Sequence, residues 1–420
     1  MSASNFTVRT HRVQGQHIRE YAAATRYNEE DVLYLEAKQY IPKSNPDPKP
    51  GDVTILATHA MSFPKELYEP LWEDILLSGA RHGLRIRSIW IADCSNQGSS
   101  GVINEAVQGD EPSFFDYPRD MLHMINTFRH EFPQPIVGVG HSIGGTALVQ
   151  LAFLHPRLLA GLVLFDPVIG INAGVEFATM FFSSSIRPDL WATREEAERH
   201  SKAIFRTWDQ RVFDRWLKHG FRKTPTLLHS EAGKTTLKTT KAQESWTCGR
   251  SWFEPLPEDG TLSNPLTRAK YPDQNDSVRS MHPFFRAEDL NVWNDLPRLR
   301  PGVLFIFPST GPMTSIEALK AKVERTGTSV GGSGGVTEGR ISQVVIPDTG
   351  HLLPFEQPAK CAAAAAEWIA KDVAAWSARR EYAAKNRDDI SIDQLALSKE
   401  WIKQAKVFYQ RIKRRERAKL

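Results

Sequence analysis

The chain has few cysteines, little net charge and no long hydrophobic run. Its three cysteines, Cys94, Cys248 and Cys361, are odd in number and far apart in 420 residues. They therefore indicate neither a disulfide framework nor a metal site. No apolar run approaches the roughly 20 residues that span a bilayer, and the first residues contain no apolar signal core, so we expect neither a membrane span nor secretion. A net charge of +4 is too small at this length to indicate a nucleic-acid partner.

The composition that remains is ordinary for a soluble globular protein. Hydrophobic residues make up 41% of the chain and charged residues 24%, both close to the usual values. A length of 420 residues is large for a single domain. We therefore expect a globular core with an inserted or appended module.

The most informative stretch is Pro135–Val149, PIVGVGHSIGGTALV. The apolar residues from Ile136 to Val139 predict a buried parallel strand, and the run after Gly145 predicts a helix. Between them lies G-H-S-I-G, whose glycines are needed where a serine occupies a tight strand-to-helix turn. Ser142 would then present its oxygen at a helix N-terminus, where developing negative charge is favoured. Here the chain resembles the α/β-hydrolase family, and we predict Ser142 as the nucleophile.

Two further strand ends carry candidate partners for Ser142. The predicted strand 158–165 is followed by Asp166, and the last predicted strand, 341–346, is followed shortly by His351. Active-site residues of open α/β sheets gather at such carboxyl ends. The next core strand ends without a carboxylate, and His351 alone among thirteen histidines follows the final strand. We therefore predict Asp166 as the orienting acid and His351 as the general base, in the chain order of the family.

Other aspartates admit competing interpretations. Asp93 follows the strand 84–92 and could be a second acid, but a turn-capping role is favoured. Asp348 precedes His351 by three residues and is expected to fix its loop. Asp166 itself could cap the next helix, and we favour the catalytic role.

The oxyanion hole is predicted on the loop THAMSF, after the strand 53–57. The resemblance places a His-Gly loop here, whose backbone N–H groups bind the developing oxyanion. By position, Met61 would supply one N–H and Ile143 the other. The usual glycine is replaced by Ala60, and the alternative interpretation is an ordinary loop.

The pattern of core strands stops between about residues 168 and 299. We expect an α/β-hydrolase core in two parts, 1–167 and 300–378, with a mainly helical cap at 168–299 between them. A helical basic tail is expected at 379–420. The mostly parallel central sheet would belong to the core. The cap is rich in aromatic residues, some of which should line an apolar pocket over the nucleophile.

Within the cap, Thr193 and Glu196 form a T-x-x-E capping box. They predict one long helix that reaches His219 and ends at Gly220. Four lysines lie in polar segments of the cap, and a solvated face is favoured over a phosphate site: Lys223, Lys234, Lys238 and Lys241.

Several segments together are similar to the fungal toxin-biosynthesis hydrolases, a group that includes peroxisomal acyl-CoA hydrolases. They are THAMSFPKELYEPLW, GHSIGG, LVLFDP, TTLKTTKAQESW and HPFFRAE. The resemblance implies hydrolysis of an acyl-CoA thioester or an ester of a bulky apolar acid in secondary metabolism. A carboxylic-ester hydrolase and an acyltransferase or non-catalytic relative remain open, as does a homodimer. No metal or other cofactor is required by the predicted chemistry.

The chain ends in Ala418-Lys419-Leu420. This tripeptide is a conservative variant of the S-K-L peroxisomal address. It predicts the peroxisome as the location and the peroxisomal import receptor as a partner. The alternative is an arbitrary helix end.

Overall fold

The computed structural model describes most of the chain in five stretches: residues 5–171, 178–251, 284–311, 315–385 and 395–417. The chain divides into two compact units, residues 1–374 and 375–420. The first unit contains the sheet and all of the predicted site. In the part of the chain that the structure describes, no helix has both the length and the apolarity needed to cross a bilayer.

An eight-stranded sheet forms the centre of the first unit, in the order β1-β2-β4-β3-β5-β6-β12-β13. Its strands are β1 (Phe6–Gln14), β2 (Tyr34–Pro42), β3 (Val53–Thr58), β4 (Ile86–Ala92), β5 (Ile136–His141), β6 (Gly161–Phe165), β12 (Gly302–Pro308) and β13 (Ile341–Ile346). The β1–β2 and β2–β4 pairs are antiparallel, and all other pairs are parallel. The α/β class and the mostly parallel sheet predicted from the sequence are confirmed.

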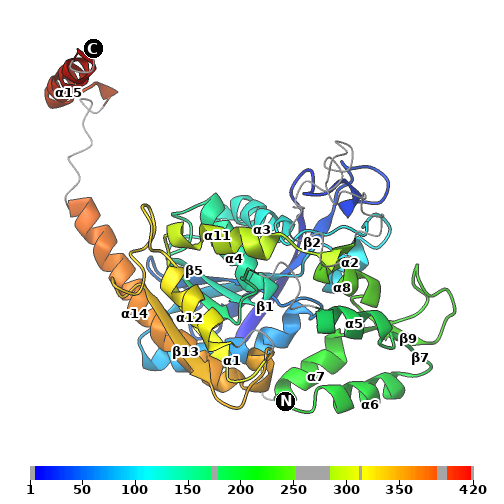
Figure 1. The fold of residues 1–420 in the computed structure, drawn as a ribbon. Coiled ribbons are helices and arrows are strands. Elements are labelled where there is room, and N and C mark those ends of the chain that lie inside the picture. The colour runs from blue at the N-terminus through cyan, green and yellow to red at the C-terminus, as the bar shows by residue number, and fades with distance from the viewer. Residues whose placement is uncertain (1–4, 172–177, 252–283, 312–314, 386–394, 418–420) are drawn as a thin grey trace. The chain divides into compact units, whose positions relative to one another are not determined.

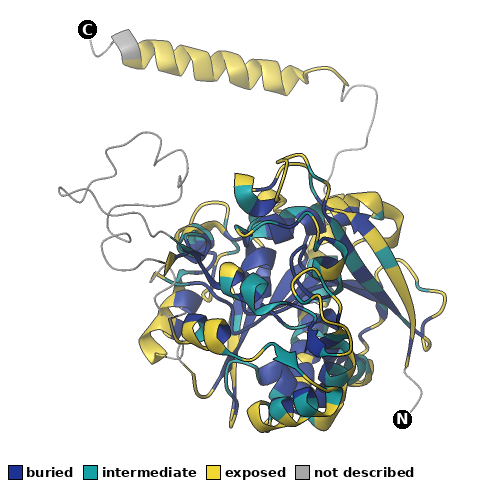
Figure 2. Cartoon of the chain, turned by 90° about the vertical axis from the view of Figure 1, so that its right-hand side faces the viewer, coloured by how far each residue is buried: buried dark blue, intermediate teal, exposed yellow. Residues whose placement is uncertain are grey.

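Helices cover both faces of this sheet (Figure 1). The core helices are α1 (Glu69–Arg81), α2 (Gly98–Ile103), α3 (Asp116–Thr127), α4 (Ile143–Leu154), α11 (Glu288–Asp295), α12 (Ile316–Arg325), α13 (Leu353–Glu356) and α14 (Pro358–Lys385). Four of them, α3, α4, α11 and α12, share one large apolar cluster with the sheet. Strands β3, β5, β6 and β12 are buried along their whole length, as the dark blue centre of Figure 2 shows. Continuous burial explains their unbroken apolar sequences.

Short 3-10 helices complete the connections within the described stretches. They are η1 (Ala22–Ala24), η2 (Lys65–Tyr68), η3 (Arg129–Glu131) and η5 (Leu296–Arg298). The η2 helix matters most for the site because it directly follows the loop after β3. Its four residues are all buried.

The cap lies between β6 and β12. Its described elements are α5 (Ala178–Ile186), β7 (Leu190–Trp191), α6 (Arg194–Ile204), α7 (Gln210–His219), β8 (Phe221–Lys223), β9 (Thr235–Leu237), α8 (Lys241–Cys248), β10 (Arg250–Ser251) and β11 (Phe284–Phe285). Besides helices, the cap contains a three-stranded sheet, β7-β9-β8, and the pair β10-β11. The sequence did not indicate these strands, because runs of two or three residues are too short to show a period.

The single long helix predicted from Thr193 to His219 is wrong. Thr193 does cap α6 through the N–H of Glu196, but the chain leaves the helix after Ile204 and starts α7 at Gln210. A new cap, Asp209, accepts a hydrogen bond from the N–H of Arg211 at 2.8 Å. The N–H of Asp209 donates to the carbonyl of Phe355, also at 2.8 Å. Tertiary contact with the core therefore breaks the helix.

The second unit contains the end of α14 and the helix α15 (Lys399–Arg417). The helical character predicted for the tail is present in both. The terminal tripeptide, residues 418–420, lies outside the described residues.

Candidate active site

Ser142 lies on a sharp turn between β5 and α4. Its backbone has φ of 57° and ψ of −123°, a conformation that costs a non-glycine residue about 1–3 kcal/mol. A Cβ on Gly140 would lie 2.8 Å from the Cα of Gly145, and a Cβ on Gly144 would lie 2.6 Å from the carbonyl oxygen of Thr58. The predicted strand, turn and helix are therefore present, and the glycines are required by contact with neighbouring backbone.

The structure brings together the three residues predicted for a triad. The Oγ atom of Ser142 is 2.9 Å from Nε2 of His351, and Nδ1 of His351 is 2.6 Å from Oδ2 of Asp166. Asp166 directly follows β6, has φ of 37° and is 1% exposed. An Nδ1–H that donates to the carboxylate leaves Nε2 as the acceptor for the Ser142 proton. This is the arrangement that proton abstraction from serine needs.

The side chain of Glu356 fixes the loop that carries His351. The N–H of Gly350 donates to Oε2 of Glu356 at 2.7 Å. Asp348 is exposed and has φ of 59°, so it shapes the turn after β13 by its backbone. The carboxylate that holds this loop is therefore that of Glu356, whereas the sequence predicts this role for Asp348.

The backbone N–H groups of the loop after β3 are hydrogen-bonded on both sides of Met61. The N–H of Ala60 donates to Oη of Tyr68 at 2.8 Å, and the N–H of Ser62 donates to Oε1 of Gln97 at 2.7 Å. Between them, the N–H of Met61 has no protein acceptor within the described residues, and the same holds for the N–H of Ile143 at the start of α4. Free N–H groups at these two positions are what an oxyanion hole requires.

One hydrogen-bond chain joins this loop to the loop of His351. Oη of Tyr68 accepts from Ala60 and donates to Nδ1 of His141 at 2.8 Å. Nε2 of His141 donates to the carbonyl of His351 at 2.9 Å. Burial lowers the pKa of His141 well below its usual value, so the ring is neutral and has one donor and one acceptor. The sequence pattern did not indicate either role, although His141 is part of the G-H-S motif and Tyr68 of the segment PKELYEPLW.

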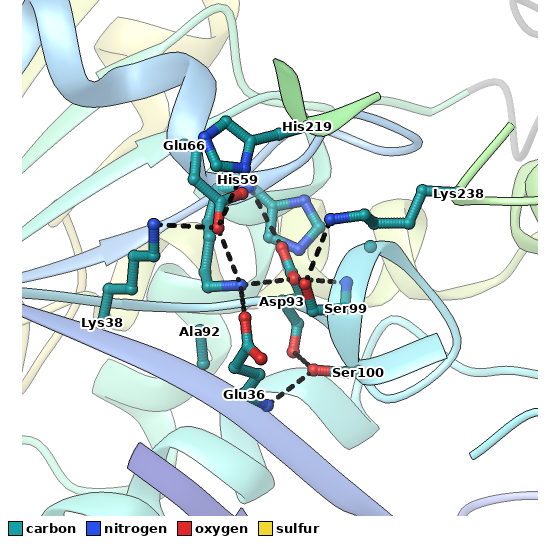
Figure 3. A network of polar contacts seen from close by, with 12 residues as sticks. Glu36, Lys38, His59, Glu66, Ala92, Asp93, Ser99, Ser100, His219 and Lys238 are labelled. Carbon is teal, nitrogen blue, oxygen red and sulfur yellow. Dashed lines mark hydrogen bonds and ion pairs between the residues drawn. The ribbon is translucent and has the colours of Figure 1, made fainter. Parts of the chain in front are cut away.

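A buried ion network holds the other end of the same loop (Figure 3). Nζ of Lys65 donates to Oδ2 of Asp93 at 2.7 Å and to Oε1 of Glu36 at 2.8 Å, and the backbone N–H of Lys65 donates to Oδ1 of Asp93 at 3.0 Å. Asp93 also accepts from the N–H of Ser99 in α2 at 2.8 Å. Both oxygens of Asp93 are thus occupied, in agreement with the turn-capping role that the sequence favoured.

The network continues to the cap through Glu66. Nζ of Lys38 lies 3.1 Å from Oε1 of Glu66, and Nδ1 of His219, the last residue of α7, lies 3.9 Å from the same atom. Burial lowers the pKa of His219 to about 4, so His219 is neutral near pH 7. The positive charge opposite the three carboxylates therefore comes from Lys65 and Lys38, and Lys238 acts on Glu66 without a direct ion pair.

Apolar side chains of the cap pack with the two residues predicted to form the oxyanion hole. Met61 and Ile143 share a buried cluster with Phe181 of α5 and Cys248 of α8, and the sulfur atoms of Cys248 and Met61 are 3.5 Å apart. Ser142 is 3% exposed. This cluster gives the reacting group an apolar surrounding, in which hydrogen bonds to a developing charge are strengthened.

A second, aromatic cluster joins the cap to both loops of the site. Phe63 and Phe355 have ring centroids 5.2 Å apart, and Trp208 of the cap lies 5.5 Å from the first and 5.1 Å from the second. The cap aromatics that the sequence singled out thus serve in part to hold the core loops. Among the described residues, no group of three or more His, Cys, Asp or Glu side chains could hold a metal ion.

Comparisons with known proteins show the family of the chain. A model of the Alpha/beta hydrolase family matches residues 55–364. The type I acyl-CoA thioesterase mpaH' of Penicillium brevicompactum is 36% identical over 100% of both chains. The Abhydrolase domain-containing protein AFT2-1 of Alternaria alternata is 28% identical over 57% of this chain and 84% of its own.

A solved structure repeats the fold over the full length. The peroxisomal alpha-beta-hydrolase Lpx1 of Saccharomyces cerevisiae has a TM-score of 0.67 at 16% identity, and the match covers 100% of this chain and 99% of that chain. The family model covers well over half of the chain, and a relative above 30% identity covers all of it. The chain therefore belongs to the alpha/beta hydrolase family.

Proposed function

We propose that this chain hydrolyses the acyl-CoA thioester of a bulky apolar acid, through an acyl-enzyme on Ser142. The observation that carries the proposal is the continuous hydrogen-bond chain from Ser142 through His351 to Asp166, with distances of 2.9 and 2.6 Å. Whole-length relatives that are named type I acyl-CoA thioesterases support a thioester as the bond attacked. The toxin-biosynthesis resemblance supports a place in fungal secondary metabolism.

The mechanism follows from the roles of these groups. Nε2 of His351 takes the proton of Ser142 as Oγ attacks the thioester carbonyl carbon, while Asp166 stabilises the imidazolium. The N–H groups of Met61 and Ile143 bind the carbonyl oxygen as it becomes negative, and each such donor contributes about 3 kcal/mol. The C–S bond breaks, and His351 gives its proton to the departing thiolate. Water activated by His351 then hydrolyses the acyl-enzyme and restores Ser142.

The apolar cluster of Met61, Ile143, Phe181 and Cys248 supports an apolar acyl group beside the nucleophile. A charged or strongly polar acyl chain would lose hydration there without a partner. The same machinery also cleaves carboxylic esters, so the leaving group decides between thioesterase and esterase.

The decisive assay compares the coenzyme A thioester and the methyl ester of one aromatic acid. We expect kcat/KM to favour the thioester by at least about tenfold, a difference of about 1.4 kcal/mol in transition-state stabilisation. Thiol release is followed with a disulfide reagent, and acid release by chromatography. A preference for the methyl ester would identify a carboxylesterase, and turnover of neither would indicate a non-hydrolytic relative.

We also propose a core at 1–167 and 300–378, a cap at 168–299, and a basic tail at 379–420 that carries a peroxisomal address. The tripeptide Ala418-Lys419-Leu420 is its support, since import receptors read such sequences at a free C-terminus. A fluorescent protein fused before the full chain should enter peroxisomes, and deletion of the three residues should leave it in the cytosol. Peroxisomal fluorescence after the deletion would contradict the address.

A further inference from the structure

A cleft of about 550 Å³ lies where the start of the chain and α2 meet the cap. It contains none of the triad residues, and its volume is in the range of ligand sites. The lining residues that bear on its chemistry are Thr25, Arg26, Gln108, Leu227, Lys238 and Trp246.

Two buried polar atoms of uncharged side chains in this lining have no partner in the part of the chain that the structure describes. They are Oγ1 of Thr25 and Oε1 of Gln108, on side chains that are 5% and 8% exposed. The other end of the Gln108 amide donates to the carbonyl of Ala24 at 2.9 Å, which fixes its orientation. Since buried polar groups are normally hydrogen-bonded, an acceptor and a hydroxyl in the wall of the cleft lack the partners that such groups usually have.

The cleft also contains cations that are not committed to ion pairs. Arg26 has no carboxylate within ion-pair distance among the described residues. Nζ of Lys238 donates to Oγ of Ser99 at 3.3 Å, and its charge acts on Glu66 without a direct ion pair. Arg222 is held by Glu105 in two hydrogen bonds.

The other charged residues in and near the cleft bear on the positive charge of Arg26 and Lys238. Asp110 is the other carboxylate of the lining. Elsewhere in the cap, Lys234 pairs with Glu231 and Lys241 with Asp189. Among the described lining residues, Arg26 and Lys238 are the cations without a direct ion pair, and they favour an anion beside them.

The cleft and the nucleophile are separated by one helix, α8. Trp246 lies on the cleft side, whereas Thr247 accepts a hydrogen bond from Nδ2 of Asn96 at 2.7 Å and Cys248 contacts Met61. Asn96 lines both the cleft and a small space beside Ile143. A helix with its side chains is about 10–12 Å wide, a distance that an extended pantetheine arm spans.

We propose that this cleft binds the nucleotide and pantetheine part of coenzyme A, while the acyl group enters the apolar cluster beside Ser142. Arg26 and Lys238 bind the phosphates, Gln108 accepts from a pantetheine amide, and Trp246 with Leu227 provides an apolar surface for the adenine ring. This assignment rests on the proposed function, because it names the leaving-group side of the same substrate.

The test compares two thioesters of one acyl group: the coenzyme A thioester and the N-acetylcysteamine thioester, which has neither phosphates nor nucleotide. In the wild type, kcat/KM should favour the first. In the double variant Arg26→Gln/Lys238→Gln, we expect the ratio of the two values to fall at least about tenfold, mostly through KM for the coenzyme A thioester. The variant Lys234→Gln removes a cap charge outside the cleft and should keep the wild-type ratio.

The outcomes separate this assignment from the proposed function. An unchanged ratio in the double variant, or an equal loss in Lys234→Gln, would overturn the cleft while the thioesterase activity stands. Failure of the wild type to hydrolyse either thioester would overturn the proposed function. Calorimetric titration with free coenzyme A then still tests the cleft as a binding site. Weaker binding to the double variant than to the wild type supports the assignment. Equal binding to both proteins, or no binding to the wild type, rejects it.

Discussion

Replacement of Ser142 by alanine should lower kcat about a millionfold, while the fold and substrate binding persist. Removal of the nucleophile abolishes the acyl-enzyme, and only the oxyanion donors and binding contacts would still accelerate attack by water. The substitution removes a single oxygen atom, which is hydrogen-bonded to His351, so we expect the melting temperature to change little. The rate is measured under single-turnover conditions, with a serine-directed fluorophosphonate as an independent probe.

The probe should label the wild type at Ser142 and leave the Ser142→Ala variant unmodified. A matched control is Ser78→Ala, which removes the hydroxyl of another buried serine, 4% exposed in α1, and should keep both labelling and turnover. Label on a different residue, or a loss of less than about a hundredfold in Ser142→Ala, would show that another group attacks the substrate.

Asp166→Asn should lower kcat about ten-thousandfold with a smaller effect on KM. An asparagine amide that donates to Nδ1 of His351 forces the ring proton onto Nε2, where it can no longer accept the proton of Ser142. The volume of the side chain is nearly unchanged, so thermal stability should stay close to that of the wild type. Steady-state kinetics and calorimetry of the same preparation separate the two effects.

Two matched substitutions discriminate the rival aspartates. Asp348→Asn should leave kcat within a factor of about two, because this side chain is exposed and such surface changes are usually nearly neutral. Asp93→Asn should lower the melting temperature, since it removes a charge that is bonded to buried Lys65. If Asp348→Asn instead reduced kcat by orders of magnitude, the acid would lie after β13 and not after β6.

Residues near strand ends were predictable because local sequence determines them. The turn at Ser142 needs glycines at fixed spacing. The positions of Asp166 and His351 follow from the order of the strands predicted from the sequence. The order of parallel strands then brings these ends to one edge of the sheet. The distances from Ser142 to His351 and from His351 to Asp166, 2.9 and 2.6 Å, depend on packing and could not be predicted from the sequence.

Features that depend on tertiary contact escaped prediction. The helix break between Ile204 and Gln210 has a single-residue local signal, the capping side chain of Asp209. It also depends on the bond from the Asp209 N–H to the loop of Phe355, which the sequence does not indicate. Similarly, His141 and Tyr68 are distant in sequence and meet through a hydrogen bond that only the fold creates. The cleft at Trp246 combines three separate segments, so its lysine was assigned from sequence to a solvated face.

The ion network around Lys65 couples folding to the binding of protons. Burial alone would raise the pKa values of Glu36 and Glu66, but the neighbouring lysine charge lowers both below the ordinary glutamate value. Burial would lower the pKa of Lys65, and Asp93 with the two glutamates raises it above the ordinary lysine value.

Each shift stabilises the folded state only while its group stays charged. The depressed carboxyl values contribute stability above about pH 4.5, and it is lost as the pH falls further. The raised lysine value contributes below about pH 10.4, and it is lost as the pH rises beyond that. Acid and alkali therefore release the same loop, the one that carries Met61, by neutralising opposite partners of a single charge cluster.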